Sequence, residues 1–153
     1  MMMALKRKDV NAFFQIYQDV ILKLPSYHDL RNENSYSMPF GYHLLMLGMC
    51  AWLSSDYTIL SNRENGRGRA DSVPFGYIIL KERREGLPNI VIEFKYSKKE
   101  STTDKDLENL AKEGLNQIKD KNYTIDLQGD TICIGLAHHG KFAMMKYEEI
   151  SLD

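Results

Sequence analysis

Two carboxylates and a lysine have the types and the spacing to form a metal site. Glu93 and Lys95 lie two positions apart in an apolar run, so an extended strand presents both side chains on one face. Asp71 lies 22 residues before Glu93, at the start of another strand-like run. A hairpin joining the two runs would turn near Glu82 and bring the two carboxylates close together. Because neighbouring carboxylates repel unless a cation lies between them, the pattern predicts a divalent metal with Lys95 beside it.

The same residues resemble a known signature. Asp71, followed by Glu93-Phe94-Lys95 at the end of the next strand, is similar to the PD-(D/E)XK motif of a nuclease superfamily. The run at residues 61–71, in which Asn-Arg-Glu precedes two glycines and an arginine, resembles one branch of it. That branch is the nuclease-like domain often found C-terminal to AAA-ATPase-like modules in bacteria and archaea. The resemblance covers residues 9–147.

This resemblance implies a fold and a set of roles. The fold is an α/β restriction-endonuclease-like core, a mixed central β-sheet flanked by helices, expected as one domain at residues 9–150 after a tail at residues 1–8. Asp71, Glu93 and the carbonyl of Phe94 would hold Mg²⁺ or Mn²⁺, which prefer hard oxygen ligands. Lys95 would orient or deprotonate the attacking water, and Gln117 would reach the substrate backbone or a metal-bound water.

Three further residues are accessory candidates with alternative interpretations. His43 would overhang the site, or it is an ordinary histidine near a helix end. Related domains often carry an acid four positions before it, whereas this chain has Pro39 there. Glu64 is a third acidic group or an ion-pair partner of a nearby arginine, and Tyr123 is a weaker accessory candidate.

Basic residues flank the expected site on both sides. They would contact phosphates, which positions a nucleic acid without reading its sequence, although solvated surface charge explains them equally well. These residues are Arg63, Arg67, Arg69, Lys98 and Lys99.

Composition narrows the class of protein. The 153 residues suit one domain, and the net charge of −1 provides no global basic field to draw the chain onto nucleic acid. Cys50 and Cys133 lie far apart in apolar runs, which indicates reduced core thiols and a cytoplasmic location. The longest apolar stretch, residues 42–53, is too short to span a bilayer, and no signal peptide is evident. Histidine and cysteine spacing also excludes the common zinc motifs.

Hydrophobic periodicity predicts the elements that must position these residues. A first helix runs from Asp9 to Leu24, ended by Pro25, and residues 26–39 read as a loop. A second helix at residues 41–53 is apolar nearly all round, with Gly48 permitting close approach of a neighbour. Residues 138–140, His-His-Gly, are typical of a turn. The remaining helix is expected at residues 103–121, and the strands at residues 57–60, 69–80, 89–96, 131–137 and 142–147.

Two hypotheses follow for the function. The first is a metal-dependent nuclease that hydrolyses phosphodiester bonds, with DNA favoured over RNA as substrate. The alternative is a catalytically silent module of the same fold that binds nucleic acid or a protein partner. In either case an upstream ATPase module or partner protein and a homodimer are compatible with the sequence, and no membrane partner is expected.

Overall fold

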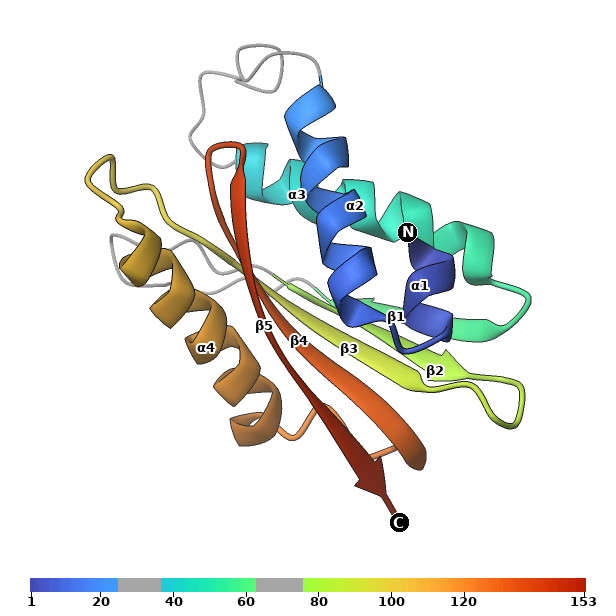
Figure 1. Ribbon diagram of the computed structural model, residues 1–153. Helices are drawn as coiled ribbons and strands as arrows, with labels where there is room; N and C mark the ends of the chain where they lie inside the picture. Colours follow the sequence, from blue (N-terminus) through green and yellow to red (C-terminus); the bar gives the residue numbers. More distant parts are fainter. Residues whose placement is uncertain (25–36, 63–75) are drawn as a thin grey trace.

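The computed structural model describes residues 1–24, 37–62 and 76–153, and these residues form a sheet with helices on both faces (Figure 1). In chain order the elements are α1 (Met2–Lys6), α2 (Val10–Lys23), α3 (Ser37–Cys50), the 3₁₀ turn η1 (Ala51–Leu53), β1 (Tyr57–Asn62), β2 (Tyr77–Glu82), β3 (Asn89–Tyr96), α4 (Asp104–Asp120), β4 (Gly129–His139) and β5 (Phe142–Leu152).

Within the described residues, five strands form one mixed sheet in the order β1-β2-β3-β4-β5. Strands β3 and β4 are parallel, and every other neighbouring pair is antiparallel. Helix α4 is the crossover between the parallel strands and covers one face, whereas α1, α2 and α3 lie on the other face (Figure 1). The predicted mixed sheet with flanking helices is therefore confirmed.

Helix α2 follows from its sequence as predicted. The Asp9 side chain accepts a hydrogen bond from the Ala12 N–H at 3.0 Å, which caps the first turn. The apolar positions Val10, Phe13 and Tyr17 then recur on one face and are buried in the main core, so the helix packs onto the sheet through that face.

Helix α3 departs from the expectation of an element buried all round. It begins at Ser37, although the sequence predicted a loop as far as residue 39, and Leu44 is 44% exposed. Gly48 is exposed and has no atom within 4 Å of the place where a Cβ would stand, so the predicted close approach there is wrong. Two other glycines, Gly114 and Gly135, make the close approaches described below.

The β2–β3 hairpin turns later than the sequence suggested. Its turn occupies residues 83–88, with Gly86 at a φ of +89°, a value that glycine adopts without strain. The register therefore places Tyr77, and not an earlier residue, opposite Glu93. The expected turn near Glu82 is wrong by about three residues, because Glu82 is still paired with Tyr57 in the sheet.

Helix α4 matches its predicted limits closely. Thr103 and Asp106 form a reciprocal capping box, in which each side chain accepts a backbone N–H of the other residue at 3.0–3.1 Å. The helix packs on β3, β4 and β5, and its buried residues include Leu107, Ala111 and Ile118.

The β4–β5 hairpin corrects the prediction of a turn at residues 138–140. His138 and His139 belong to β4, and the turn is Gly140-Lys141, with Gly140 at a φ of +56°. A two-residue hairpin loop needs a residue with positive φ, and Gly140 provides it. Both histidines can therefore remain in the strand.

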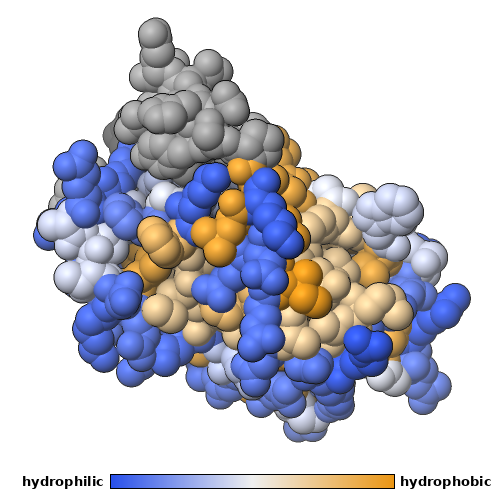
Figure 2. Space-filling view, turned by 45° about the horizontal axis from the view of Figure 1, so that its top comes forward, coloured by the Kyte–Doolittle hydropathy of each residue, from blue (hydrophilic) through white to orange (hydrophobic). Residues whose placement is uncertain are grey.

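The N-terminal residues and the surface add two observations. Residues expected to form a tail include α1, whose Met2, Ala4 and Leu5 are buried in the main core. Hydrophobic side chains also reach the surface on the face in Figure 2, and Trp52 is 89% exposed. No helix among the described residues has the length and apolar character needed to cross a membrane.

Both cysteines are buried free thiols, as predicted. Burial raises the pKa of Cys50 to about 12 and that of Cys133 to about 11, so neither thiol is ionised at neutral pH.

Candidate active site

Glu93 and Lys95 lie on the face of β3 that α4 covers. Val91 shares this face, whereas Ile92 and Phe94 point into the core beneath α2 and α3. The Glu93 side chain is fully buried, and its Oε1 lies 3.9 Å from the Nζ of Lys95, whose side chain is 16% exposed. A carboxylate is costly to bury unless cationic groups stabilise it, so this position is suited to binding a cation.

Two glycines bring α4 into contact with this pair. A Cβ at Gly114 would stand 3.3 Å from the Lys95 Cγ and 3.6 Å from the Glu93 Cγ. A Cβ at Gly135 would stand 2.0 Å from the Ala111 carbonyl oxygen, which is backbone that cannot yield. The helix therefore lies directly on β4, and its next turn is brought within reach of Lys95.

Gln117 is the α4 residue that uses this proximity. Its Oε1 accepts a hydrogen bond from the Lys95 Nζ, so the ammonium lies between the Gln117 amide and the Glu93 carboxylate. The resemblance led us to expect Gln117 to reach toward the site, and its side chain contacts Lys95 there. An ammonium held between two oxygen groups can hydrogen-bond a water or an anionic oxygen with its remaining donors.

Tyr77 is a neighbour of the site that sequence reasoning missed. It is the register partner of Glu93 on β2, and its ring lies 4.0 Å from that of Tyr123, centroid to centroid. Tyr123, an accessory candidate, therefore contacts the register partner of Glu93. The signal that identifies Tyr77 is the hairpin turn at Glu85-Gly86, since a hairpin centred on Glu85 pairs residue 77 with residue 93.

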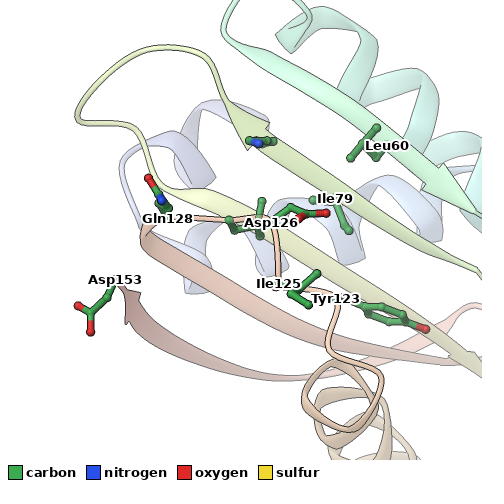
Figure 3. Close-up of a pocket in the computed structure, with 9 residues that line it drawn as sticks. Leu60, Ile79, Tyr123, Ile125, Asp126, Gln128 and Asp153 are labelled. Atoms are coloured by element: carbon green, nitrogen blue, oxygen red, sulfur yellow. The ribbon is translucent and has the colours of Figure 1, made fainter.

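A groove opens on the same face beyond the two tyrosines, with a volume of about 520 Å³. Figure 3 shows Tyr123, Ile125 and Asp126 reaching it from the loop after α4, opposite Ile79 on β2 and Leu60 on β1. Its lining combines apolar side chains with charges of both signs, including Lys81 and Asp126.

His43 lies on the opposite face of the sheet from Glu93 and Lys95. Its ring packs edge-on against Phe94 at 5.3 Å, and its Nε2 lies 3.4 Å from the Ser61 Oγ. The residue is 2% exposed, which agrees with the interpretation of an ordinary buried histidine, although it lies in the middle of α3 and not near a helix end. A role overhanging the site would require the ring to reach the other face, whereas its packing against Phe94 holds it on this one.

The other predicted residues divide into two groups. Lys98 and Lys99 directly follow β3 at the end where Lys95 lies. Among the residues that the structure describes, no three His, Cys, Asp or Glu side chains gather in a way that could hold a metal. The predicted residues outside the described ranges are Asp71, Glu64, Arg63, Arg67 and Arg69.

The chain returns to the described region at Gly76, beside the site. The Gly76 carbonyl accepts a hydrogen bond at 3.3 Å from the N–H of Phe94, the residue between Glu93 and Lys95. Asp71 lies five positions before Gly76 in the sequence. The site thus combines β3, α4 and the start of β2.

Comparison with known proteins adds the family. No curated protein gives a significant match to the chain. A family model for the PD-(D/E)XK nuclease superfamily matches residues 41–148, which is more than half of the chain and includes Asp71, Glu93, Lys95 and Gln117. The mixed sheet with helices on both faces agrees with the restriction-endonuclease-like core of that superfamily. The chain belongs to the PD-(D/E)XK nuclease superfamily.

Proposed function

We propose that this chain is a metal-dependent nuclease that hydrolyses phosphodiester bonds of nucleic acid, with DNA as the preferred substrate. The observation that carries the proposal is the meeting of Glu93, Lys95 and Gln117 on one face of the sheet. In a member of a nuclease superfamily, a buried carboxylate, an ammonium and an amide in contact are the groups that hydrolysis of an anionic ester requires.

The donor set fits a hard divalent cation. Glu93 offers carboxylate oxygens and Phe94 a backbone carbonyl, the ligand types that Mg²⁺ and Mn²⁺ prefer. Because the Glu93 carboxylate is fully buried, a cation beside it would offset the cost of desolvation. Asp71 would be the second carboxylate ligand. When bound, the ion would polarise the phosphoryl group and neutralise charge that develops in the transition state.

The residues of the chain would perform the remaining tasks. Lys95 would orient the attacking water through its ammonium and offset negative charge on the pentacoordinate phosphorus. Gln117 would hold the Lys95 ammonium in place and present its amide N–H groups to a substrate oxygen. Tyr123, whose ring contacts Tyr77 opposite Glu93, would be an accessory group, and Glu64 would be a second one.

Binding of the substrate would depend on local charge. The net charge of −1 makes long-range attraction weak, so basic residues beside the site would provide the phosphate contacts. A nuclease with little global attraction for nucleic acid needs a partner to bring the substrate, and an upstream ATPase module of the kind found in the resembling branch would serve this role. A cytoplasmic location and a homodimer complete the proposal. The proposed phosphate-contacting residues are Arg63, Arg67, Arg69, Lys98 and Lys99.

The test is cleavage of a mixed panel of DNA and RNA in the presence of Mg²⁺ or Mn²⁺. Wild-type protein is compared with Lys95→Ala and Asp71→Ala, and with Lys112→Ala as a control, because Lys112 is exposed on α4. We expect metal-dependent cleavage by the wild type and the control, and a loss of about 10²-fold or more in the other two. Equal cleavage by all four proteins would indicate contamination and end the enzyme proposal.

Binding without cleavage has its own signature. If the wild type binds nucleic acid but cleaves nothing with either metal, the chain is the silent module of the alternative hypothesis. Titration with Mn²⁺ by calorimetry then separates a site that holds metal but lacks its proper substrate from one that holds no metal.

A further inference from the structure

His138 is a fully buried polar residue that the proposed hydrolysis does not use. It is the register partner of Tyr96 at the end of the parallel β3–β4 pair. Its side chain lies on the face beneath α2 and α3, opposite to the face that carries the Glu93 and Lys95 side chains. A polar ring in this core has to be held by specific hydrogen bonds.

Both ring nitrogens of His138 have partners, and together they select one tautomer. The Nδ1 lies 3.3 Å from the main-chain carbonyl oxygen of Lys95, which only accepts, so Nδ1–H donates to it. The Nε2 then accepts the hydrogen bond of the Tyr17 hydroxyl at 2.6 Å. A chain of hydrogen bonds therefore runs from α2 through β4 to the backbone of Lys95.

Aromatic neighbours fix the plane of the His138 ring. Tyr42 stacks on it with 4.4 Å between ring centroids and an interplanar angle of 15°, and Tyr17 meets it edge-on at 5.8 Å. The Tyr42 hydroxyl donates to the Gly140 carbonyl, which ties the stacking ring to the β4–β5 turn. Burial lowers the pKa of His138 to about 4, so the ring is neutral at neutral pH and Nε2 stays an acceptor.

The hydrogen bond to Lys95 belongs to a set that holds the end of β3. The Ser97 N–H donates to the His138 carbonyl at 2.9 Å, and the His139 Nδ1–H donates to the Ser97 carbonyl at 2.9 Å. Lys95 is the last residue but one of β3, and among the described strands it pairs with β4 alone, because the β2 register ends at Glu93. At this end of the strand the described sheet therefore restrains the backbone from one side.

We infer that His138, oriented by Tyr17, is a positioning residue that fixes the main chain of Lys95 from the opposite face of the sheet. The Lys95 carbonyl is bonded to the same Cα that carries the Lys95 side chain. Holding that oxygen restrains the backbone dihedrals of Lys95 and so the direction in which its ammonium reaches Glu93 and Gln117. The consequence for hydrolysis rests on the proposed function, whereas the consequence for the Lys95 geometry does not.

A small displacement is enough to matter at such a site. Misplacement of a reacting group by about 1 Å can cost about 10²-fold in rate, even when the altered residue does not touch the substrate. A histidine that only fills space in the core would instead affect stability and leave the turnover of folded protein unchanged.

The test compares substitutions that keep or remove the Nδ1 donor. The amide nitrogen of asparagine occupies nearly the same place as Nδ1, so His138→Asn keeps a donor for the Lys95 carbonyl, and His138→Leu removes it. Tyr17→Phe removes only the hydroxyl that orients the ring. Tyr57→Phe is its matched control, because Tyr57 is 1% exposed in the same core cluster and makes no contact with His138 among those the structure describes.

The first readout is kinetic, on protein shown to be folded at the assay temperature. We expect His138→Leu to lower kcat by about 10- to 100-fold with little change in KM, and His138→Asn to recover most of that loss. The kcat of Tyr17→Phe should lie between those of His138→Leu and His138→Asn. The kcat of Tyr57→Phe should equal that of the wild type. Equal kcat values for folded wild type and His138→Leu would overturn the inference, as would equal losses in the leucine and asparagine variants.

The second readout needs no activity. In NMR spectra of protein labelled at the lysine ε-carbons, the Lys95 signal is assigned by its absence in Lys95→Arg. We expect His138→Leu to shift or broaden that signal and His138→Asn to leave it near the wild-type position. An unmoved signal in His138→Leu refutes the positioning role even if the wild type is an active nuclease. If His138→Leu shifts the Lys95 signal but the wild type cleaves nothing, the positioning role is upheld. That outcome counts only against the proposed function.

Discussion

At the scale of single residues, the site depends on a buried carboxylate that lies beside an ammonium. Glu93 is fully buried with the Lys95 Nζ 3.9 Å away, and a divalent ion would stabilise it further. We predict that Mg²⁺ or Mn²⁺ at about 100 times its Kd stabilises the wild type by about 3 kcal/mol, because a ligand that binds only the folded state shifts the equilibrium by mass action.

Glu93→Gln should abolish this stabilisation, since an amide is a poor substitute for a charged ligand. The measurement is thermal unfolding with and without metal. Glu85→Gln serves as the control, because Glu85 is exposed in the β2–β3 turn. An unchanged response to metal in Glu93→Gln would exclude Glu93 as a ligand.

Gln117 offers a second prediction at the same scale. Its Oε1 accepts from the Lys95 Nζ, and loss of one such hydrogen bond in the transition state costs about 1.4 kcal/mol, or about tenfold in rate. Gln117→Ala should therefore lower kcat about tenfold and leave the helix intact, because alanine is a strong helix former. Steady-state kinetics check this against Asn116→Ala, the exposed neighbour on α4; similar kcat values in the two variants would contradict it.

At the scale of elements, the approach of α4 to the sheet decides the geometry of the site. Gly135 allows this approach because a Cβ there would lie 2.0 Å from the Ala111 carbonyl oxygen and 2.6 Å from the Leu115 nitrogen. Both atoms are helix backbone, so the whole helix would have to move. We expect Gly135→Ala to destabilise the fold by about 3 kcal/mol, measured by urea unfolding.

Gly48→Ala provides the contrast, because nothing lies within 4 Å of its Cβ position and alanine favours a helix. That substitution should stabilise the protein by up to about 1 kcal/mol. Similar effects from both substitutions would show that the close approach at Gly135 does not determine stability.

Gly114 separates stability from activity on the same helix. A Cβ there would press at 3.3 Å on the Lys95 Cγ, which is part of a flexible side chain, while alanine would also raise helix propensity. Gly114→Ala should therefore change the free energy of unfolding by less than about 1 kcal/mol and lower kcat markedly through displacement of Lys95. Parallel unfolding and kinetic measurements test this, and an unchanged kcat would show that Lys95 adapts without cost.

At the scale of the whole molecule, the buried His138 makes stability depend on pH. Burial lowers its pKa to about 4 in the folded protein, whereas an unfolded histidine titrates near 6.5. Between these values the unfolded chain binds the proton and the folded chain does not. Stability from this residue is therefore full above about pH 6.5 and falls as the pH drops toward 4, by about 3 kcal/mol in total.

The difference between wild type and His138→Asn isolates this contribution, since the carboxylates that also titrate in this range are common to both. Urea unfolding from pH 7.5 to 4 should show a steeper loss for the wild type. Parallel pH profiles would contradict the assignment of a neutral, buried histidine.

The sequence alone determined the parts of this protein that depend on local patterns. The limits of α2 and α4 follow from caps and apolar periodicity, and β3 follows from a mainly apolar run in which Glu93 and Lys95 are the charged residues. The placement of Glu93 and Lys95 on one face follows from the two-residue period of a strand. The resemblance that pointed to the superfamily also depended only on residue types and spacing.

Only the tertiary structure decided how these parts meet. The register that puts Tyr77 beside Glu93 depends on where the hairpin turns, and a shift of a few residues is invisible to composition. Gly114 and Gly135 look like ordinary glycines until helix and strand are packed against each other, and His138 looks like a turn residue until three elements enclose it. Such contacts join residues far apart in the chain, so their energies depend on the packed fold and leave no periodic trace in the sequence.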